Sequence, residues 1–94
     1  MNKTVLITGS TSGIGLGIAH QFAKEGYNVM FHGLEANGQD IANNIAQEHN
    51  IKVGFSNANL LQSEAIEHLI NETINTFGSL HVLVNNAGIH FVSP

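Results

Sequence analysis

The sequence predicts an α/β fold in which helices cover both faces of a doubly wound parallel sheet. Three observations support this prediction. Short apolar runs rich in β-branched residues alternate with amphipathic segments of helical length, glycines stand where helices should end, and a glycine-rich segment follows the first apolar run. Strands that alternate with such helices form right-handed βαβ crossovers and hence a parallel sheet. With 94 residues, the chain has room for one domain at most.

The expected elements follow from these patterns in chain order. The strands should cover residues 4–8, 29–31, 51–55 and 82–84. The first helix should begin at about Ile14 and end before Gly26, and the second should run from about 37 to 49. The third should have Ser63 as its N-cap and end at Gly78. Its inner face should consist of five apolar residues, Ile66, Leu69, Ile70, Ile74 and Phe77.

Composition excludes several classes of function. The net charge is −4 and only three residues are Lys or Arg, so we expect no nucleic-acid partner. The apolar runs are too short to span a bilayer and no signal segment opens the chain, so we expect a cytoplasmic protein without membrane contact. The absence of cysteine excludes disulfides and thiolate chemistry. The six histidines form no i, i+4 pair on a helix, so we assign no metal.

The segment TGSTSGIG places three glycines between the first strand and the first helix. A helix N-terminus binds phosphate well because its N–H groups are unpaired and the helix dipole favours negative charge. In such a unit, glycines supply the tight turn, backbone access to a pyrophosphate and close packing of helix on strand. The residues suited to these tasks are Gly9, Gly13 and Gly15, with the Thr11 and Ser12 hydroxyls as additional donors. A glycine-bearing turn without a ligand is the alternative, but the strand roughly 20 residues further on favours a dinucleotide site.

Two motifs together resemble the short-chain dehydrogenase/reductase family: TGSTSGIG at 8–15 and NNAG at 85–88. The resemblance spans essentially the whole chain and implies the strand order 3-2-1-4 with a nicotinamide dinucleotide cofactor. GIGLGIA at 13–19, the Gly33-Leu34 pair, and NAGI followed by VSP near residue 94 are similar to bacterial D-3-hydroxybutyrate dehydrogenases. This second resemblance implies hydride transfer between NAD(H) and a small hydroxy acid or keto acid, with 3-hydroxybutyrate and acetoacetate as the expected pair.

The expected cofactor is NAD rather than NADP. A 2′-phosphate dianion needs charged partners, and the family's NADP users often carry a basic residue where this chain has Ser12 or Gly33. No basic residue lies between Lys24 and Lys52, whereas Glu35 offers a carboxylate near the adenosine ribose. Glu35 as an exposed loop charge without a ligand is an equally open interpretation.

The resemblance implies further cofactor contacts at the ends of the later strands. Asn59-Leu60 stands where the family usually has an Asp and an apolar residue against the adenine, and Asn retains an acceptor oxygen. The asparagines after the fourth strand are expected both to contact the nucleotide and to tie strands together. The implied cofactor-binding residues are Gly9, Thr11, Ser12, Gly13, Ile14, Gly15, Leu34, Glu35, Asn59, Leu60, Asn86, Ala87 and Gly88.

No catalytic residue is assigned. The family uses a serine and a Tyr-x-x-x-Lys pair for proton transfer, but the only tyrosine is Tyr27 and Phe31 stands four residues later. We therefore interpret residues 1–94 as the N-terminal, dinucleotide-binding part of a longer enzyme, expected to be a homotetramer acting on a small-molecule substrate. His90 is the candidate substrate contact, with a residue that merely lines the loop as the alternative.

Two other functions remain open. One is a different reductase of the same family, such as a 3-oxoacyl-[acyl-carrier-protein] reductase, and the other is a non-catalytic dinucleotide-binding module. A basic side chain near Ser12 or Gly33 would favour the reductase, and the sequence has none there. The presence or absence of the serine and the Tyr-x-x-x-Lys pair beyond Pro94 would separate an enzyme from a binding module.

Overall fold

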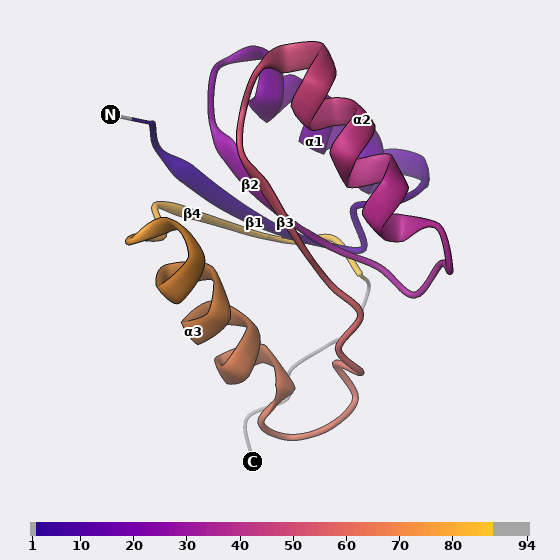
Figure 1. Ribbon diagram of the computed structural model, residues 1–94. Helices are drawn as coiled ribbons and strands as arrows, with labels where there is room; N and C mark the ends of the chain where they lie inside the picture. Colours follow the sequence, from indigo (N-terminus) through magenta and orange to yellow (C-terminus); the bar gives the residue numbers. More distant parts are fainter. Residues whose placement is uncertain (1, 88–94) are drawn as a thin grey trace.

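The computed structural model describes residues 2–87, and in that range four parallel strands form one sheet in the order β3-β2-β1-β4 (Figure 1). The strands are β1 (Thr4–Thr8), β2 (Asn28–His32), β3 (Val53–Ser56) and β4 (Val82–Asn85). The helices are α1 (Gly13–Lys24), α2 (Gly38–His49) and α3 (Ala65–Phe77). The predicted fold class and strand order are confirmed.

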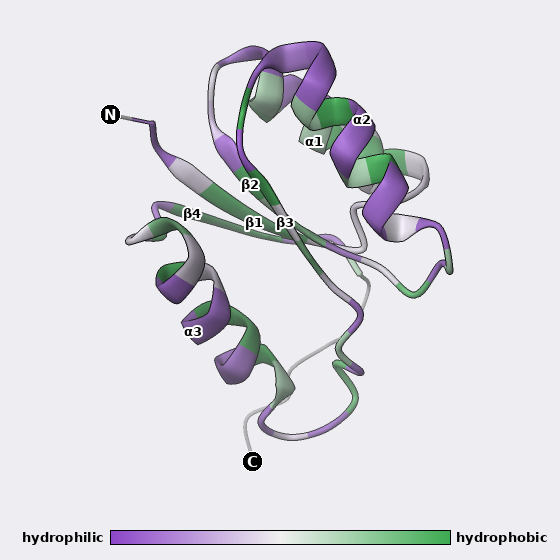
Figure 2. Cartoon of the chain, viewed as in Figure 1, coloured by the Kyte–Doolittle hydropathy of each residue, from purple (hydrophilic) through white to green (hydrophobic). Residues whose placement is uncertain are grey.

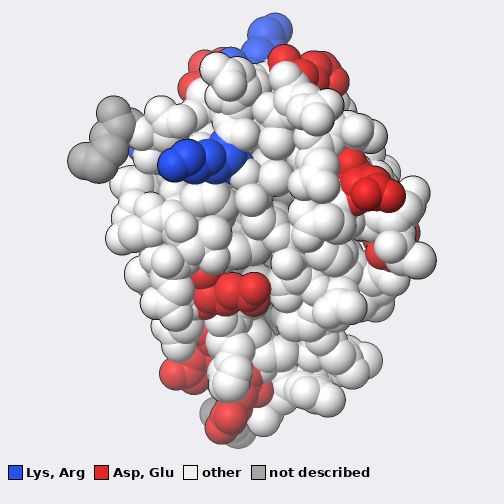
Figure 3. Space-filling model, viewed as in Figure 1, with Lys and Arg blue, Asp and Glu red and all other residues white. Residues whose placement is uncertain are grey.

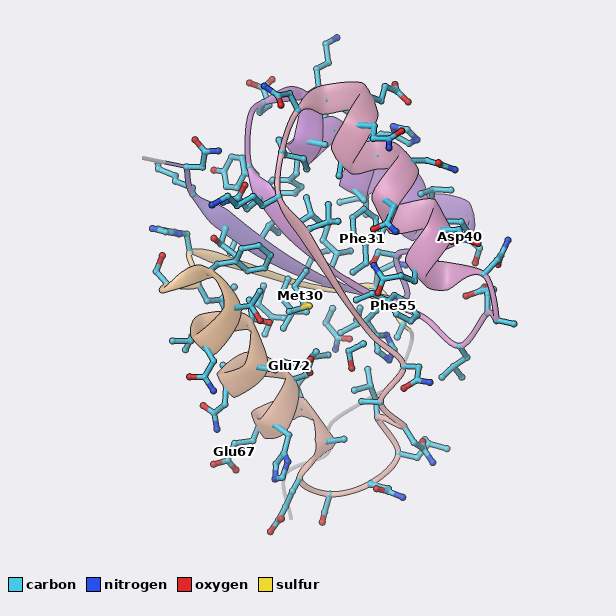
Figure 4. The ribbon with its side chains drawn as sticks, viewed as in Figure 1. Met30, Phe31, Asp40, Phe55, Glu67 and Glu72 are labelled. Atoms are coloured by element: carbon cyan, nitrogen blue, oxygen red, sulfur yellow. The ribbon has the colours of Figure 1, made fainter. Side chains whose placement is uncertain are left out.

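The sheet separates two hydrophobic cores, because successive residues of a strand face opposite sides. Val5, Ile7 and Phe31 pack on the side covered by α1 and α2, whereas Leu6 and Met30 pack on the α3 side (Figure 4). In Figure 2 the apolar residues concentrate on the strands, while much of α2 and α3 is hydrophilic. The central strands β1 and β2 are buried along their whole length. Burial of each large apolar side chain of these strands stabilises the fold by about 1.5–3 kcal/mol.

The ends of the helices agree with the sequence in two places and differ in one. Gly26 and Gly78 follow α1 and α3 with φ of 86° and 90°, the left-handed conformation expected of glycines that end helices. The N-cap of α3 is Glu64, so the prediction of Ser63 is wrong by one position. Two consecutive turns, closed by bonds from Gln62 N to Asn59 O and from Ala65 N to Gln62 O, delay the start of this helix.

Two other predictions about helix and strand limits need correction. The third strand begins at Val53 rather than Ile51, because Asn50 adopts a left-handed conformation and the Ile51 N–H still bonds to Ala46 O of α2. On α3, Ile74 is 40% exposed, and Thr73 is buried instead. The Thr73 hydroxyl donates to Leu69 O at 2.7 Å, which satisfies its polar group inside the core.

No helix among the described residues has the length and apolar character needed to cross a membrane.

Candidate nucleotide-binding site

The carboxyl ends of the parallel strands share one edge of the sheet, and the loops that follow them surround a hollow of about 360 Å³. Open α/β sheets bind their ligands at this edge. The predicted residues that line the hollow come from every loop: Gly9, Thr11 and Ser12 after β1, Leu34 and Glu35 after β2, Asn59 and Leu60 after β3, and Ala87 after β4. Gly88 and His90 lie outside the described residues.

The glycines of the first loop have two separate structural roles. Gly9 and Gly13 have φ of 62° and 55°, which L side chains rarely adopt, so they allow the chain to turn. A Cβ at Gly15 would overlap the Gly9 carbonyl oxygen and the Asn86 side-chain amide. Gly15 therefore permits the close approach of α1 to the end of β1. A Cβ at Gly13 would meet no atom within 4 Å, so the space beside this residue is open to a ligand.

The N-terminus of α1 is suited to an anion. Its N-cap, Ser12, makes no side-chain capping bond, and Leu16 donates the first helical bond to Ser12 O at 3.2 Å. The N–H groups of Gly13, Ile14 and Gly15 precede this bond and have no partner within the helix. No acidic residue lies in the first turn of α1, whereas α2 has Asp40 and α3 has Glu67 in theirs. The positive end of this helix dipole therefore has no compensating carboxylate in its own first turn.

Side-chain hydrogen bonds join the glycine loop to the end of β4. The Thr8 hydroxyl accepts the backbone N–H groups of Asn86 and Ala87 at 3.0 and 3.2 Å and donates to Asn85 Oδ1 at 3.1 Å. Asn86 Nδ2 donates to Gly9 O at 3.1 Å. The structural role expected for these asparagines is confirmed for Asn86, which fixes the orientation of the Gly9 peptide group.

Glu35 supplies a negative charge at the rim of the hollow. The Thr11 hydroxyl donates to Glu35 Oε1. This bond lowers the pKa of Glu35 from its ordinary value of 4.5, with further contributions from its own backbone N–H and the Ser12 hydroxyl. A Cβ at Gly33 would overlap the Thr11 side chain, so position 33 has no room for a carboxylate of its own.

The loop after β3 forms the opposite wall. Asn59 Oδ1 accepts the Leu61 N–H at 3.0 Å, so the acceptor that the sequence suggests for the adenine already bonds to the backbone. The amide NH₂ of Asn59 and the second lone pair of its oxygen remain for a ligand. Leu34 and Leu61 are 75% and 80% exposed where they line the hollow, and Leu60 is buried. Leu61 is an apolar wall residue that sequence reasoning missed.

His32, the last residue of β2, is a second residue that sequence reasoning missed. Its ring is buried, with Nδ1 3.0 Å from the Gly9 N and Nε2 2.9 Å from the Ala58 O. These bonds link residues 23 and 26 positions away along the chain. The one available signal was a polar side chain at the carboxyl end of an apolar strand.

The amino ends of the strands, opposite the glycine loop, border a second hollow with a different lining. This larger hollow, of about 660 Å³, lies beside Lys3, Phe22 and Tyr27, but neither a helix N-terminus nor the glycine loop opens into it. The Tyr27 ring packs edge-on against Phe22, with ring centroids 4.9 Å apart. His81 Nδ1 accepts the Thr4 N–H at 3.0 Å, which ties the start of β1 to the start of β4.

Two histidines that the sequence spacing did not pair also meet in the structure. His20 Nδ1 of α1 and His49 Nε2 of α2 lie 3.4 Å apart, and the exposed Glu48 carboxylate is 3.3 Å from His49 Nε2. The ligand atoms of all three residues lie within 4.8 Å of one another. Because His49 ends α2, which runs antiparallel to the strands, this group is remote from the nucleotide hollow.

Residues 3–94 match the short chain dehydrogenase family. Over 92 residues the chain is 42% identical to a 3-oxoacyl-[acyl-carrier-protein] reductase of Staphylococcus epidermidis, covering 95% of this chain and 37% of the relative. It is 41% identical to a D-beta-hydroxybutyrate dehydrogenase of Cupriavidus necator, covering 97% of this chain and 35% of the relative. The chain thus spans little more than a third of the length of these proteins.

Solved structures share the same fold. L-sorbose reductase from Gluconobacter frateurii, complexed with NADPH and L-sorbose, superposes with a TM-score of 0.86 at 30% identity. The superposition covers 99% of this chain and 36% of the reductase chain. A 3-oxoacyl-[acyl-carrier protein] reductase from Brucella melitensis has a TM-score of 0.85 at 29% identity, with 95% of this chain and 35% of that chain covered.

Proposed function

Because the chain belongs to the short-chain dehydrogenase family, we propose that residues 1–94 are the dinucleotide-binding part of an NAD-dependent oxidoreductase. The observation that carries this proposal is the glycine loop, which opens onto an α1 N-terminus without an acidic residue in its first turn, beside a hollow with a carboxylate at its rim. The preferred substrate is a short 3-hydroxy acid with a free carboxylate, with 3-hydroxybutyrate and acetoacetate as the reacting pair.

The pyrophosphate would bind at the N-terminus of α1. The N–H groups of the first turn have no helical partner and would be available to an anion there, with the Thr11 and Ser12 hydroxyls close by in the same loop. The adenine would lie between the exposed apolar side chains Leu34 and Leu61, near the Asn59 amide. The bound dinucleotide would supply the hydride acceptor or donor, and these residues would orient it.

The preference for NAD is supported by charge at the rim. The lowered pKa keeps Glu35 ionised near neutral pH, so a 2′-phosphate dianion beside it would meet repulsion instead of a basic partner. The face of the molecule in Figure 3 carries scattered acidic side chains and no cluster of basic ones. The L-sorbose reductase structure contains NADPH, so the preference proposed for this chain rests on its own Glu35 and not on the likeness to that structure.

A 3-oxoacyl-[acyl-carrier-protein] reductase is the second candidate function, because the Staphylococcus epidermidis relative is as similar to this chain as the hydroxybutyrate dehydrogenase is. A non-catalytic dinucleotide-binding module is the third. For either enzyme, we propose that the proton-transferring Ser, Tyr and Lys follow Pro94, since Tyr27 packs on Phe22 at the far end of the sheet. We further propose a cytoplasmic homotetramer, with His90 near the substrate carboxylate and no metal in the reaction.

A cofactor and substrate panel tests these alternatives on the intact protein. We expect kcat/KM with NAD(H) to exceed that with NADP(H) by at least about tenfold, or about 1.4 kcal/mol. Glu35→Lys should reduce or reverse this preference, and Glu25→Lys, on the far end of α1, should leave it unchanged. A wild-type preference for NADP(H) would overturn the NAD assignment. Activity with acyl thioesters but not with 3-hydroxybutyrate or acetoacetate would replace the first candidate by the second.

A further inference from the structure

The buried ring of His32 joins two loops that the sheet itself keeps apart. The loop after β1 contains Gly9 and the loop after β3 contains Ala58, and β2 lies between these strands. His32 ends β2, and its Nδ1 and Nε2 atoms reach the Gly9 N–H and the Ala58 carbonyl at 3.0 and 2.9 Å. One side chain therefore spans the proposed pyrophosphate wall and the proposed adenine wall of the same hollow.

The two bonds determine the form of the ring. A backbone N–H can only donate, so His32 Nδ1 must accept the Gly9 proton and carry none of its own. The Ala58 carbonyl can only accept, so Nε2 must carry the proton. The network thus assigns a neutral imidazole in the Nε2–H tautomer, with its one acceptor and its one donor both in use.

The peptide groups on both sides of the Gly9 Cα are held by side-chain hydrogen bonds. His32 accepts the Gly9 N–H, and Asn86 donates to the Gly9 carbonyl at 3.1 Å. With φ of 62°, Gly9 sets the direction in which the loop leaves β1 and approaches α1. The Gly9 amide is therefore a structural donor, and the N–H groups that remain for phosphate are those at the start of α1.

We propose that His32 is a positioning residue for the dinucleotide. Its neutral ring holds the glycine loop and the loop from Ala58 to Leu61 at the spacing that lets one nucleotide contact both. Two other bonds join Ser10 and His32 and secure the β1 side: the Ser10 N–H donates to His32 O at 2.7 Å, and the His32 N–H donates to the Ser10 hydroxyl oxygen at 3.0 Å. On the β3 side the Gly33 N–H donates to Ser56 O at 3.2 Å, and the ring extends the connection beyond the end of β3 to Ala58. Preorganisation of this kind raises affinity because less ordering is left to the binding step.

The test separates the two bonds by substitution. His32→Asn places an acceptor near the Nδ1 position and loses the group that reaches Ala58, whereas His32→Gln places a donor near Nε2 and loses the acceptor for Gly9. His81→Gln is the matched control, because His81 Nδ1 also accepts a backbone N–H at 3.0 Å, that of Thr4, but at the opposite end of β1.

Two readouts on the intact protein decide the proposal, which rests on the proposed dinucleotide function. Calorimetric titration with NADH should give dissociation constants raised at least about tenfold in both His32 variants, as expected from losing a buried hydrogen bond. The kcat at saturating cofactor should remain within about twofold of wild type. His81→Gln should lower the melting temperature without changing the dissociation constant. Equal affinity losses in all three variants, or wild-type affinity in folded His32 variants, would overturn the positioning role.

Amide hydrogen exchange without cofactor keeps this result distinct from the proposed function. Exchange of the Gly9 amide should accelerate in His32→Gln and stay close to wild type in His32→Asn, because only the former loses the acceptor of that proton. If the exchange pattern is as predicted but the wild-type protein binds neither NADH nor NADPH, the hydrogen bond from Gly9 to His32 is confirmed. The dinucleotide function and the positioning role of His32 are then both wrong. If wild type binds NADH and the exchange pattern is absent, the His32 proposal alone fails.

Discussion

The two ends of the sheet are tied by the same kind of bond but differ in what surrounds it. At each end of β1 a histidine Nδ1 accepts a backbone N–H at 3.0 Å, that of Thr4 to His81 at the start of the strand and that of Gly9 to His32 just after its end. His81 is exposed, whereas His32 is buried among loops with left-handed glycines, an open helix N-terminus and an ionised carboxylate. A strand end therefore becomes a binding site through the loops that follow it.

The hollow that we propose for the nucleotide is the smaller of the two. The amino end has the larger hollow, about 660 against 360 Å³, but the C-terminal part of α1, Tyr27 and the residues before β1 line it. Helix C-termini carry a partial negative charge and repel phosphate. The chemistry of the α1 N-terminus, and not size, assigns the nucleotide to the carboxyl end.

Among the substitutions that test this difference between the two ends of the sheet, Gly15→Ala should have the largest effect. The added Cβ would overlap the Gly9 carbonyl oxygen and the Asn86 amide, so α1 must move away from the loop. We expect a loss of about 1–3 kcal/mol in the free energy of unfolding and an NADH affinity reduced about 100-fold or more, or about 2.7 kcal/mol. Chemical denaturation and calorimetric titration measure the two quantities.

Gly17→Ala is the control for this prediction. A Cβ there would meet no atom within 4 Å, so the substitution should stabilise α1 by about 0.5–1 kcal/mol through helix propensity and leave affinity unchanged. If Gly15→Ala is as well tolerated as Gly17→Ala, close approach of α1 to β1 is not required at the carboxyl end.

The next largest effect should come from the amino end, with Gly26→Ala. The residue has φ of 86°, so alanine introduces backbone strain of about 1–2 kcal/mol although no atom lies within 4 Å of its Cβ. We expect a lower melting temperature and an NADH dissociation constant within about twofold of wild type. A clear change in the dissociation constant of the folded variant would break the separation of the two ends.

The smallest effect should come from the Thr11 to Glu35 hydrogen bond at the rim. Because the folded-state pKa of Glu35 is lowered, its contribution to stability is present above the ordinary value of 4.5 and is lost as the pH falls through the folded-state pKa. Thr11→Val removes the largest cause of that shift, so the Glu35 pKa should rise toward its ordinary value. A carboxyl-carbon NMR titration reports it directly, and an unchanged pKa in the variant would contradict the assigned cause.

The fold and the glycine loop could be predicted because their signals in the sequence are local, whereas the predicted residues of the hollow after β2, β3 and β4 came from the family resemblance. The alternation of strands and helices, the turning glycines and the ends of α1 at Gly26 and α3 at Gly78 depend on neighbouring residues. His32 and His81 were missed because their bonds join positions 23 and 77 apart. Thr73 was missed because its burial depends on a bond to Leu69 O that no hydrophobic pattern shows.

Selective ¹⁵N labelling of glycine and titration with NAD tests the central claim most directly. Gly9, Gly13 and Gly33 lie at the carboxyl end, while Gly26 and Gly78 lie at the C-termini of α1 and α3, at the opposite end. We expect large amide shift changes at these first three glycines and at Gly15, whose N–H lies in the first turn of α1, and small changes at Gly26 and Gly78. Changes centred on Gly26 and Gly78, or no change at Gly13 with NAD bound, would show that the dinucleotide does not bind at the N-terminus of α1.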